Sequence, residues 1–153
     1  MAEYLDDPDA TREALSEDGW LQTGDLGAID DRDYLRIVGR AKDMLIVGGF
    51  NVYPAEVESA LLRHPDVRQA ALIGVPDQRL GEVGMAFVVT RSGDRATGRR
   101  ILAWCREQMA NYKVPRLIEV VEELPMNATG KVVKDALREQ AIRAAGSRGL
   151  GGS

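Results

Sequence analysis

Short apolar runs, separated by turn residues, constrain the fold of this chain more than any other feature of its sequence. Four of them have the length of strands: MLIV, VRQAALIGV, VGMAFVV and LIEVV, all of which follow Gly39. VRQAALIGV and VGMAFVV are separated by PDQRLGE, a loop that contains Pro and Gly. The pattern predicts strands that are joined partly by turns and partly by longer connections.

Three further segments have helical features. Pro54 occupies a first-turn position ahead of an acidic segment with an apolar face. Thr97 is expected to cap a second helix, in which apolar residues recur on one side from Ile101 to Met109. A third helix is expected over roughly 132–144. The resulting order β-α-β-β-α-β-α predicts an α+β domain, a small mixed sheet with covering helices.

The first 38 residues differ from this domain, because they are acidic and contain few large apolar side chains. LGAID and YLRIV flank a polar turn from Asp30 to Asp33, which predicts a β-hairpin. The preceding DDPDATREAL predicts a short helix capped near Asp9 or Thr11. This region is expected to be a satellite of the main domain, or the edge of something larger.

Composition excludes several classes of partner. A net charge of −4 gives no attraction to nucleic acid or anionic lipid. The longest apolar runs are too short to form a transmembrane segment, and the N-terminus does not resemble a signal peptide. The single cysteine, Cys105, cannot form an internal disulfide, which fits a reducing compartment. We therefore expect a cytoplasmic protein.

The glycine and lysine of NATGK, which ends at Lys131, occur together in phosphate-binding P-loops, but the spacing here excludes that motif. Pro125 stands where its first glycine is required, and Val132 replaces the Ser or Thr that would bind Mg²⁺. Taken alone, Lys131 is either an ordinary solvated lysine or a cation presented to an anionic substrate.

The other candidate residues also allow a structural and a functional interpretation. Asp25 in TGDLG fits a turn, or a carboxylate that accepts hydrogen bonds from vicinal hydroxyls. Gly48 and Gly49 fit relief of backbone strain after a strand, or a surface along which a thin ligand lies. His64 is expected to be a helix cap or solvated, and Cys105 inert core. No metal site is predicted, because no second His or Cys has ligand spacing.

Four motifs in order carry a family resemblance: GWLQTGD (19–25), GRAKDMLIVGGFNVYPAEVE (39–58), NYKVP (111–115) and PMNATGK (125–131). Together they resemble the C-terminal part of the adenylate-forming (ANL superfamily) enzymes, which include acyl-CoA synthetases, peptide-synthetase adenylation domains and luciferases. The likeness extends from Tyr4 to about Gln140. The sequence of these motifs is most similar to that of fatty-acid–CoA ligases and of ligases of steroid-derived acids, both of actinobacterial type.

The resemblance implies an activity and a role for several residues. The family activates a carboxylic acid with ATP and Mg²⁺ to an acyl-adenylate, and acyl-CoA synthetases then transfer the acyl group to coenzyme A. Lys131 corresponds to the lysine that reaches the carboxylate and the α-phosphate, where a cation stabilises developing charge. Asp25 and Arg40 correspond to nucleotide-binding residues that contact the ribose region of ATP.

The resemblance also implies rotation of the C-terminal domain between the two half-reactions. Lys42 corresponds to the hinge pivot. Gly48 and Gly49 would belong to the CoA-facing surface, with Gly49 beside the pantetheine channel, which a side chain would fill.

The implied domain organisation is incomplete. Residues 1–39 would be the end of the N-terminal AMP-binding domain, 40–43 the hinge, 44–144 the C-terminal domain and 145–153 a flexible tail. No stretch matches the family's phosphate loop or acyl pocket, so the chain is expected to be inactive alone. Its partners would be its own N-terminal domain and the acid substrate.

Two alternatives stay open. Within the family, the chain could belong to an adenylation domain or acyl-AMP ligase that loads a carrier protein, although the absence of a carrier motif favours CoA. It could also be a stand-alone binding module. A module of that kind would need none of Asp25, Arg40, Gly49 and Lys131, so their joint presence favours an enzyme.

Overall fold

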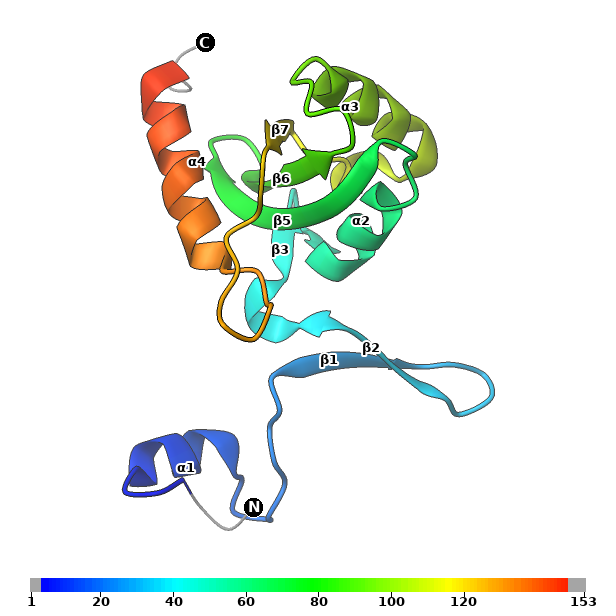
Figure 1. Cartoon of the computed structure of the whole chain (residues 1–153). Coiled ribbons are helices and arrows are strands. Elements are labelled where there is room, and N and C mark those ends of the chain that lie inside the picture. Colours follow the sequence, from blue (N-terminus) through cyan, green and yellow to red (C-terminus); the bar gives the residue numbers. More distant parts are fainter. Residues whose placement is uncertain (1–3, 149–153) are drawn as a thin grey trace. The chain divides into compact units, whose positions relative to one another are not determined.

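The computed structural model describes residues 4–148 (Figure 1). The chain divides into two compact units, and the boundary falls between Lys42 and Asp43.

The first unit begins with helix α1 (Pro8–Ala14). Its N-cap is Asp7, whose carboxylate accepts the N–H of Ala10 at 2.9 Å. Proline at the first position suits a helix start, because its missing N–H would have no partner there. The cap therefore lies two residues before Asp9, the earlier of the two expected positions.

The rest of the first unit is the predicted hairpin, in which β1 (Asp25–Ile29) pairs antiparallel with β2 (Leu35–Arg40). The carboxylate of Asp30 closes the turn by accepting the N–H groups of Arg32 and Tyr34, at 2.9 and 3.0 Å. Within this unit no strand residue is fully buried. A two-stranded sheet of this kind has little stability of its own.

The second unit contains a five-stranded sheet, which confirms the α+β prediction. Its strands are β3 (Leu45–Val47), β4 (Phe50–Val52), β5 (Val67–Asp77), β6 (Gly81–Thr90) and β7 (Leu117–Val121). The order is β4-β3-β6-β5, and β7 also pairs with β6. The sheet is mixed, because β7 runs parallel to β6 whereas the other pairs are antiparallel.

Helices cover both faces of this sheet. Helices α2 (Pro54–Leu61) and α3 (Thr97–Gln108) lie on one side, and α4 (Lys134–Arg148) lies on the other (Figure 1). Two short 3₁₀ segments, η1 (Ala41–Asp43) and η2 (Asn111–Lys113), complete the elements. Because α4 continues to Arg148, residues 145–148 of the expected tail are helical, and 149–153 lie outside the described residues.

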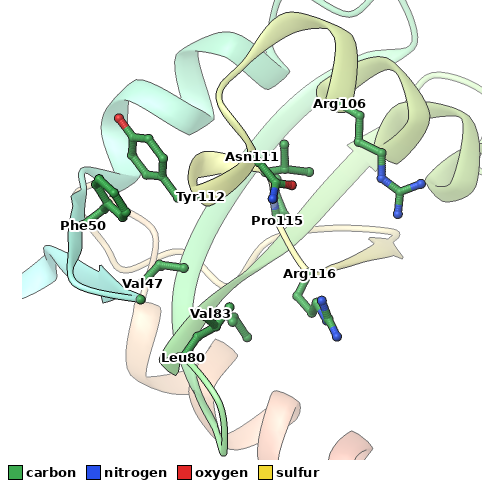
Figure 2. A pocket seen from close by; sticks show the side chains of 11 residues that line it. Val47, Phe50, Leu80, Val83, Arg106, Asn111, Tyr112, Pro115 and Arg116 are labelled. Atoms are coloured by element: carbon green, nitrogen blue, oxygen red, sulfur yellow. The ribbon is translucent and has the colours of Figure 1, made fainter.

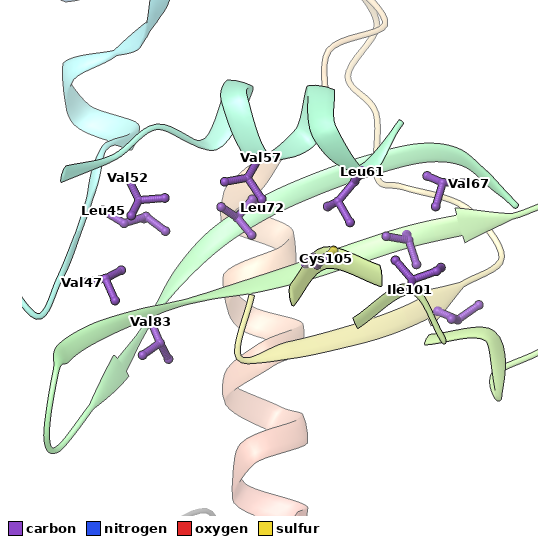
Figure 3. Close-up of a cluster of buried hydrophobic side chains, with 13 residues drawn as sticks. Leu45, Val47, Val52, Val57, Leu61, Val67, Leu72, Val83, Ile101 and Cys105 are labelled. Carbon is purple, nitrogen blue, oxygen red and sulfur yellow. The ribbon is translucent and has the colours of Figure 1, made fainter. Parts of the chain in front are cut away.

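Alternate side chains of the central strands serve two cores. Leu72 of β5 packs with Val57 and Leu61 of α2 and with Ile101 of α3 (Figure 3). Its neighbours in sequence belong instead to the core that contains Leu137 of α4. Since successive residues of a strand point to opposite faces, a strand covered on both sides must be apolar throughout. This explains why the run AALIGV has no alternation.

The strand predictions need two corrections. The expected order lacks β4, which is a separate strand of only three residues that pairs with β3. The loop expected at PDQRLGE is also much shorter, because β5 extends through Pro76 to Asp77 and β6 begins at Gly81. Pairing across this hairpin continues to its tip, Asp77 opposite Gly81, so only three residues form the turn.

Two side-chain predictions were also wrong. Thr97 does not cap α3: it is the first helical residue, is fully buried, and accepts a hydrogen bond from Arg100 at 2.9 Å. The His64 side chain is buried rather than solvated, and its Nδ1 accepts the N–H of Asp66; only the backbone N–H of His64 binds a helix carbonyl, that of Leu61 at the end of α2, at 3.0 Å. Its ring packs edge-on against Trp104. The prediction for Cys105 is confirmed, since it is fully buried in the core.

Candidate functional site

Asp25 and Arg40, both expected at the nucleotide, lie opposite one another at the open end of the β1–β2 hairpin. Nε of Arg40 is 3.1 Å from Oδ1 of Asp25. Both side chains remain partly exposed, at 54% for Arg40 and 31% for Asp25, so each keeps hydrogen-bonding capacity for a ligand. The chain closes behind them, because the N–H of Ala41 donates to the carbonyl of Gly24 at 2.8 Å.

Lys131 ends a compact loop organised by Asn127. The amide oxygen of Asn127 accepts the N–H groups of Thr129 and Lys131, at 3.1 and 2.8 Å. The N–H of Asn127 donates to the carbonyl of Lys131 at 2.9 Å, which closes the loop in both directions. The Lys131 side chain is exposed, and its ammonium pairs with no carboxylate of residues 4–148. The loop thus presents an uncompensated cation at a fixed backbone position.

Lys42 lies in η1, is exposed, and is the last residue of the first unit. The next residue, Asp43, starts the second unit and is 3.9 Å from the guanidinium of Arg138 on α4. The helix that follows Lys131 in sequence therefore contacts the first residue beyond Lys42.

Gly48 and Gly49 form the tight turn between β3 and β4. Their φ angles of +57° and +87° lie in the left-handed region that a two-residue hairpin turn of type I′ requires. The N–H of Gly48 donates to the carbonyl of Leu80 at 3.0 Å, which holds this turn against the β5–β6 turn. A Cβ on Gly49 would meet nothing within 4 Å, so in this unit the backbone conformation, and not space, favours glycine there.

A pocket of about 240 Å³ borders this turn (Figure 2). Its walls come from β3, β4, the β5–β6 hairpin, α3, and the segment that follows α3: Val47, Gly48, Phe50, Leu80, Val83, Arg106, Asn111, Tyr112, Val114, Pro115 and Arg116. The lining is apolar apart from Asn111, the Tyr112 hydroxyl and two arginine side chains. Gly48 is one of the walls, but Gly49 is not.

The NYKVP motif is fixed by two contacts, one to β4 and one to α2. The rings of Phe50 and Tyr112 stack with centroids 4.7 Å apart, and both are visible at one wall in Figure 2. The ammonium of Lys113 is 2.6 Å from the carboxylate of Glu56 on α2. That hydrogen bond raises the pKa of Lys113, because the neighbouring carboxylate favours the protonated ammonium.

The residue-level predictions did not include Arg106, Arg116 or the aromatic pair. Arg106 lies on the exposed side of α3, where an arginine is ordinary. Arg116 directly follows NYKVP, and this position next to a family motif is the one sequence feature that could have indicated a role for it. The pocket is lined by segments more than 60 residues apart in the chain, from Val47 to Arg116. A local sequence pattern cannot predict that such distant segments line the same pocket.

The described part of the chain has neither a metal-binding cluster nor a membrane-spanning helix. Residues 4–148 contain no group of three His, Cys, Asp or Glu side chains arranged to hold a metal ion. Over the same residues, each helix is too short or too polar to cross a bilayer.

Residues 56–131 match the family model of the AMP-binding enzyme C-terminal domain. Over 92% of the chain, the sequence is 54% identical to the 7a-methyl-1,5-dioxo-octahydro-1H-inden-4-yl-propanoyl:CoA ligase of Rhodococcus jostii, of which it covers 27%. It is 45% identical to the long-chain-fatty-acid–CoA ligase FadD13 of Mycobacterium tuberculosis, again over 92% of the chain and 27% of that protein.

Solved structures agree with these relatives. The ATP-bound MatB of Rhodopseudomonas palustris superposes with a TM-score of 0.82 at 42% identity, over 90% of this chain and 27% of that one. The chain thus spans about a quarter of the length of the relatives that it matches. By sequence and by fold, it belongs to the family of the AMP-binding enzyme C-terminal domain, as that domain occurs in adenylate-forming acyl-CoA ligases.

Proposed function

We propose that this chain is the C-terminal lid of an ATP-dependent acyl-CoA ligase. In the first step, a carboxylate oxygen of the acid attacks the α-phosphorus of ATP, and pyrophosphate leaves. In the second step, the thiol sulfur of coenzyme A attacks the acyl carbon, AMP leaves, and the thiol proton passes to solvent. The observation that carries the proposal is the pocket whose lining includes Gly48 of the predicted CoA-facing turn and the side chains of two arginines, Arg106 and Arg116.

For the first step, the proposed cation is Lys131. Negative charge accumulates where the acid meets the α-phosphate, and an ammonium without a carboxylate partner can neutralise it. Asp25 and Arg40 are proposed to bind the nucleotide, with the carboxylate accepting hydrogen bonds from the ribose hydroxyls. The ion pair between Nε of Arg40 and Oδ1 of Asp25, 3.1 Å apart, orients the Asp25 carboxylate before ATP binds. Mg²⁺ enters with ATP as part of the substrate.

For the second step, the proposed CoA site is the pocket beside Gly48. Its apolar walls, including Val47 and Val83, suit the uncharged pantetheine arm. Arg106 and Arg116 supply guanidinium groups, which bind phosphate oxygens in a bidentate manner. Gly49 continues the same turn with an open surface, which would let the thin ligand chain pass close to the backbone.

The proposed hinge is 40–43 with Lys42 as its pivot, between an N-terminal segment (1–39) and the C-terminal domain (44–144). The division of the chain between Lys42 and Asp43 supports this placement. Three apolar side chains of the hairpin are more than half exposed within the first unit: Ile29, Leu35 and Ile37. Side chains of this kind fit burial against the larger AMP-binding domain that the relatives possess.

The proposed substrates are carboxylic acids of fatty or steroid-derived type, because the similar proteins are named for a bicyclic propanoyl and a long-chain fatty acid. The relatives are also named as CoA ligases, which favours CoA over a carrier protein as acceptor. A cytoplasmic location is proposed from the single free Cys105.

The test uses the enzyme in which this chain is joined to its N-terminal AMP-binding domain. Pyrophosphate release is measured with a panel of fatty and polycyclic acids, and the products are identified by mass spectrometry with and without CoA. Acyl-CoA formation supports the proposal, whereas acyl-AMP that is passed only to a carrier protein contradicts it. Turnover by the isolated 153-residue chain would show that the proposed lid is not the whole of its function.

A further inference from the structure

The three-residue turn between β5 and β6 lies directly beside the glycine turn of the pocket. At its start, the carboxylate of Asp77 accepts the N–H groups of Arg79 and Leu80, both at 2.9 Å. At its end, the carbonyl of Leu80 accepts the N–H of Gly48 at 3.0 Å. A continuous path of hydrogen bonds therefore links the half-buried carboxylate of Asp77, through Leu80, to a wall of the pocket.

Few other backbone contacts hold the glycine turn in place. Strand β3 pairs with β6 at one register position, Val47 opposite Gly81, immediately beside the bond from Gly48 to Leu80. Leu80 contributes twice, since its side chain also lines the pocket and lies 3.1 Å from the Cβ position of Gly48. The place of the glycine turn thus depends on the shape of the turn that Asp77 closes.

A carboxylate suits this task better than a neutral acceptor. The N–H groups of Leu80 and Arg79 lower the pKa of Asp77, with a further contribution from the positive charge of Arg116. Asp77 is therefore ionised throughout the neutral range, and hydrogen bonds to an ionised acceptor are the stronger ones. Asp77 itself does not line the pocket. It acts on the pocket through the carbonyl of Leu80 that holds Gly48, and its charge also interacts with that of Arg116.

We propose that Asp77 is a positioning residue for the thioester-forming step, because it fixes the turn whose Leu80 holds Gly48 at the CoA pocket. The proposal rests on the proposed function of that pocket. It predicts an effect on one half-reaction only. The Lys131 loop is closed by Asn127, and within residues 4–148 none of its hydrogen bonds involves Asp77.

The test measures both half-reactions in the complete enzyme for Asp77→Ala and Asp77→Asn. Asp77→Ala should leave pyrophosphate release unchanged and lower kcat/KM for CoA, measured from preformed acyl-adenylate, roughly tenfold, as the loss of a hydrogen bond predicts. Asp77→Asn retains an acceptor oxygen and should recover most of this loss. Asp94→Ala is the matched control, because the Asp94 carboxylate also accepts a backbone N–H within its own loop, from Ala96 at 2.9 Å, and does not line the pocket.

The possible outcomes distinguish a failure of the positioning role of Asp77 from a failure of the proposed function. Equal loss of both half-reactions in Asp77→Ala, no loss in either, or the same selective loss in Asp94→Ala overturns the positioning role while the proposed function stands. A wild-type enzyme that forms acyl-adenylate but never acyl-CoA overturns the proposed function, and the positioning role with it. In the 153-residue chain, a Gly48 amide proton whose NMR shift is the same in wild type and Asp77→Ala also contradicts the proposal.

Discussion

The ammonium of Lys134 lies 3.1 Å from the carboxylate of Glu58, and the same carboxylate oxygen accepts the N–H of Leu72 at 2.8 Å. Lys134 starts α4, Glu58 belongs to α2, and Leu72 lies in β5 between them. Both charged side chains are only 21% exposed. This ion pair therefore joins the two helical layers across the sheet, three residues after Lys131.

Loss of the Glu58 side chain should destabilise the second unit. Glu58→Ala leaves the N–H of Leu72 and the charge of Lys134 without a partner, at a cost of about 2–3 kcal/mol. Glu58→Gln keeps an acceptor for Leu72 and should cost roughly 1 kcal/mol. Urea unfolding of the 153-residue chain checks this order, with the exposed Glu107→Ala as control. Equal stability of Glu58→Ala and wild type contradicts the role of the pair.

Removal of the Lys131 charge should separate the two half-reactions of the complete enzyme. Lys131→Ala is expected to slow acyl-adenylate formation by on the order of 100-fold or more, because a preorganised charge is lost where negative charge develops. Thioester formation from preformed acyl-adenylate should change little. Single-turnover assays of each step provide the measurement, and Arg99→Ala, another exposed cation, is the control. A comparable loss in both steps would count against this role.

The Lys131 loop also shows what sequence reasoning can reach. The conformation of NATGK is set by local hydrogen bonds, since Asn127 closes the loop with contacts no more than four residues away. Asp25 and Arg40 belong to two separate sequence motifs, and the register of the β1–β2 hairpin brings them together. The local loop and the pairing across the predicted β1–β2 hairpin could therefore be predicted from the sequence.

What the sequence did not predict is either a very short element or a feature that depends on contacts between distant segments. Strand β4 is three residues long, too short for periodicity to reveal, although a glycine pair between apolar residues is a known hairpin signal. Thr97 was expected to cap a helix, but the buried position is set by packing around the start of α3. The pocket needs Arg106 and Arg116 beside β3 and β4, which only the folded sheet arranges.

Substitution of Gly49 should affect CoA transfer more than stability alone explains. Gly49→Ala forces a side chain into a left-handed conformation, at a cost of about 1–2 kcal/mol. Gly93→Ala is the matched control, because its φ of +68° is similar and it also has nothing within 4 Å. Both variants should lose similar stability in thermal unfolding, but only Gly49→Ala, and more strongly Gly49→Leu, should slow thioester formation. Identical kinetics of Gly49→Ala and Gly93→Ala contradict a CoA-facing role.

The buried thiol should give stability that alkaline pH removes. Burial raises the pKa of Cys105 from 9.0 to about 11. The unfolded chain therefore ionises first, and the stabilisation is complete below pH 9.0 and is lost as pH rises toward 11. The difference in free energy of unfolding between wild type and Cys105→Ala, measured from pH 7 to 11, should fall over that interval. A constant difference contradicts this account, as does rapid thiol alkylation of the native chain at pH 8.

The strands of the second unit are joined to β6 very unequally. Strand β5 shares ten register pairs with it, from Val67–Thr90 to Asp77–Gly81, whereas β3 shares one. Local opening of a protein begins where the fewest backbone bonds must break, so amide hydrogen exchange should be fastest in the β3–β4 hairpin and slowest at the centre of β5 and β6. The segment that presents the glycine turn is thus the least cooperative part of the sheet. Its transient opening is expected to expose Leu45, Val47 and Val52 before the pairing of β5 with β6 is lost.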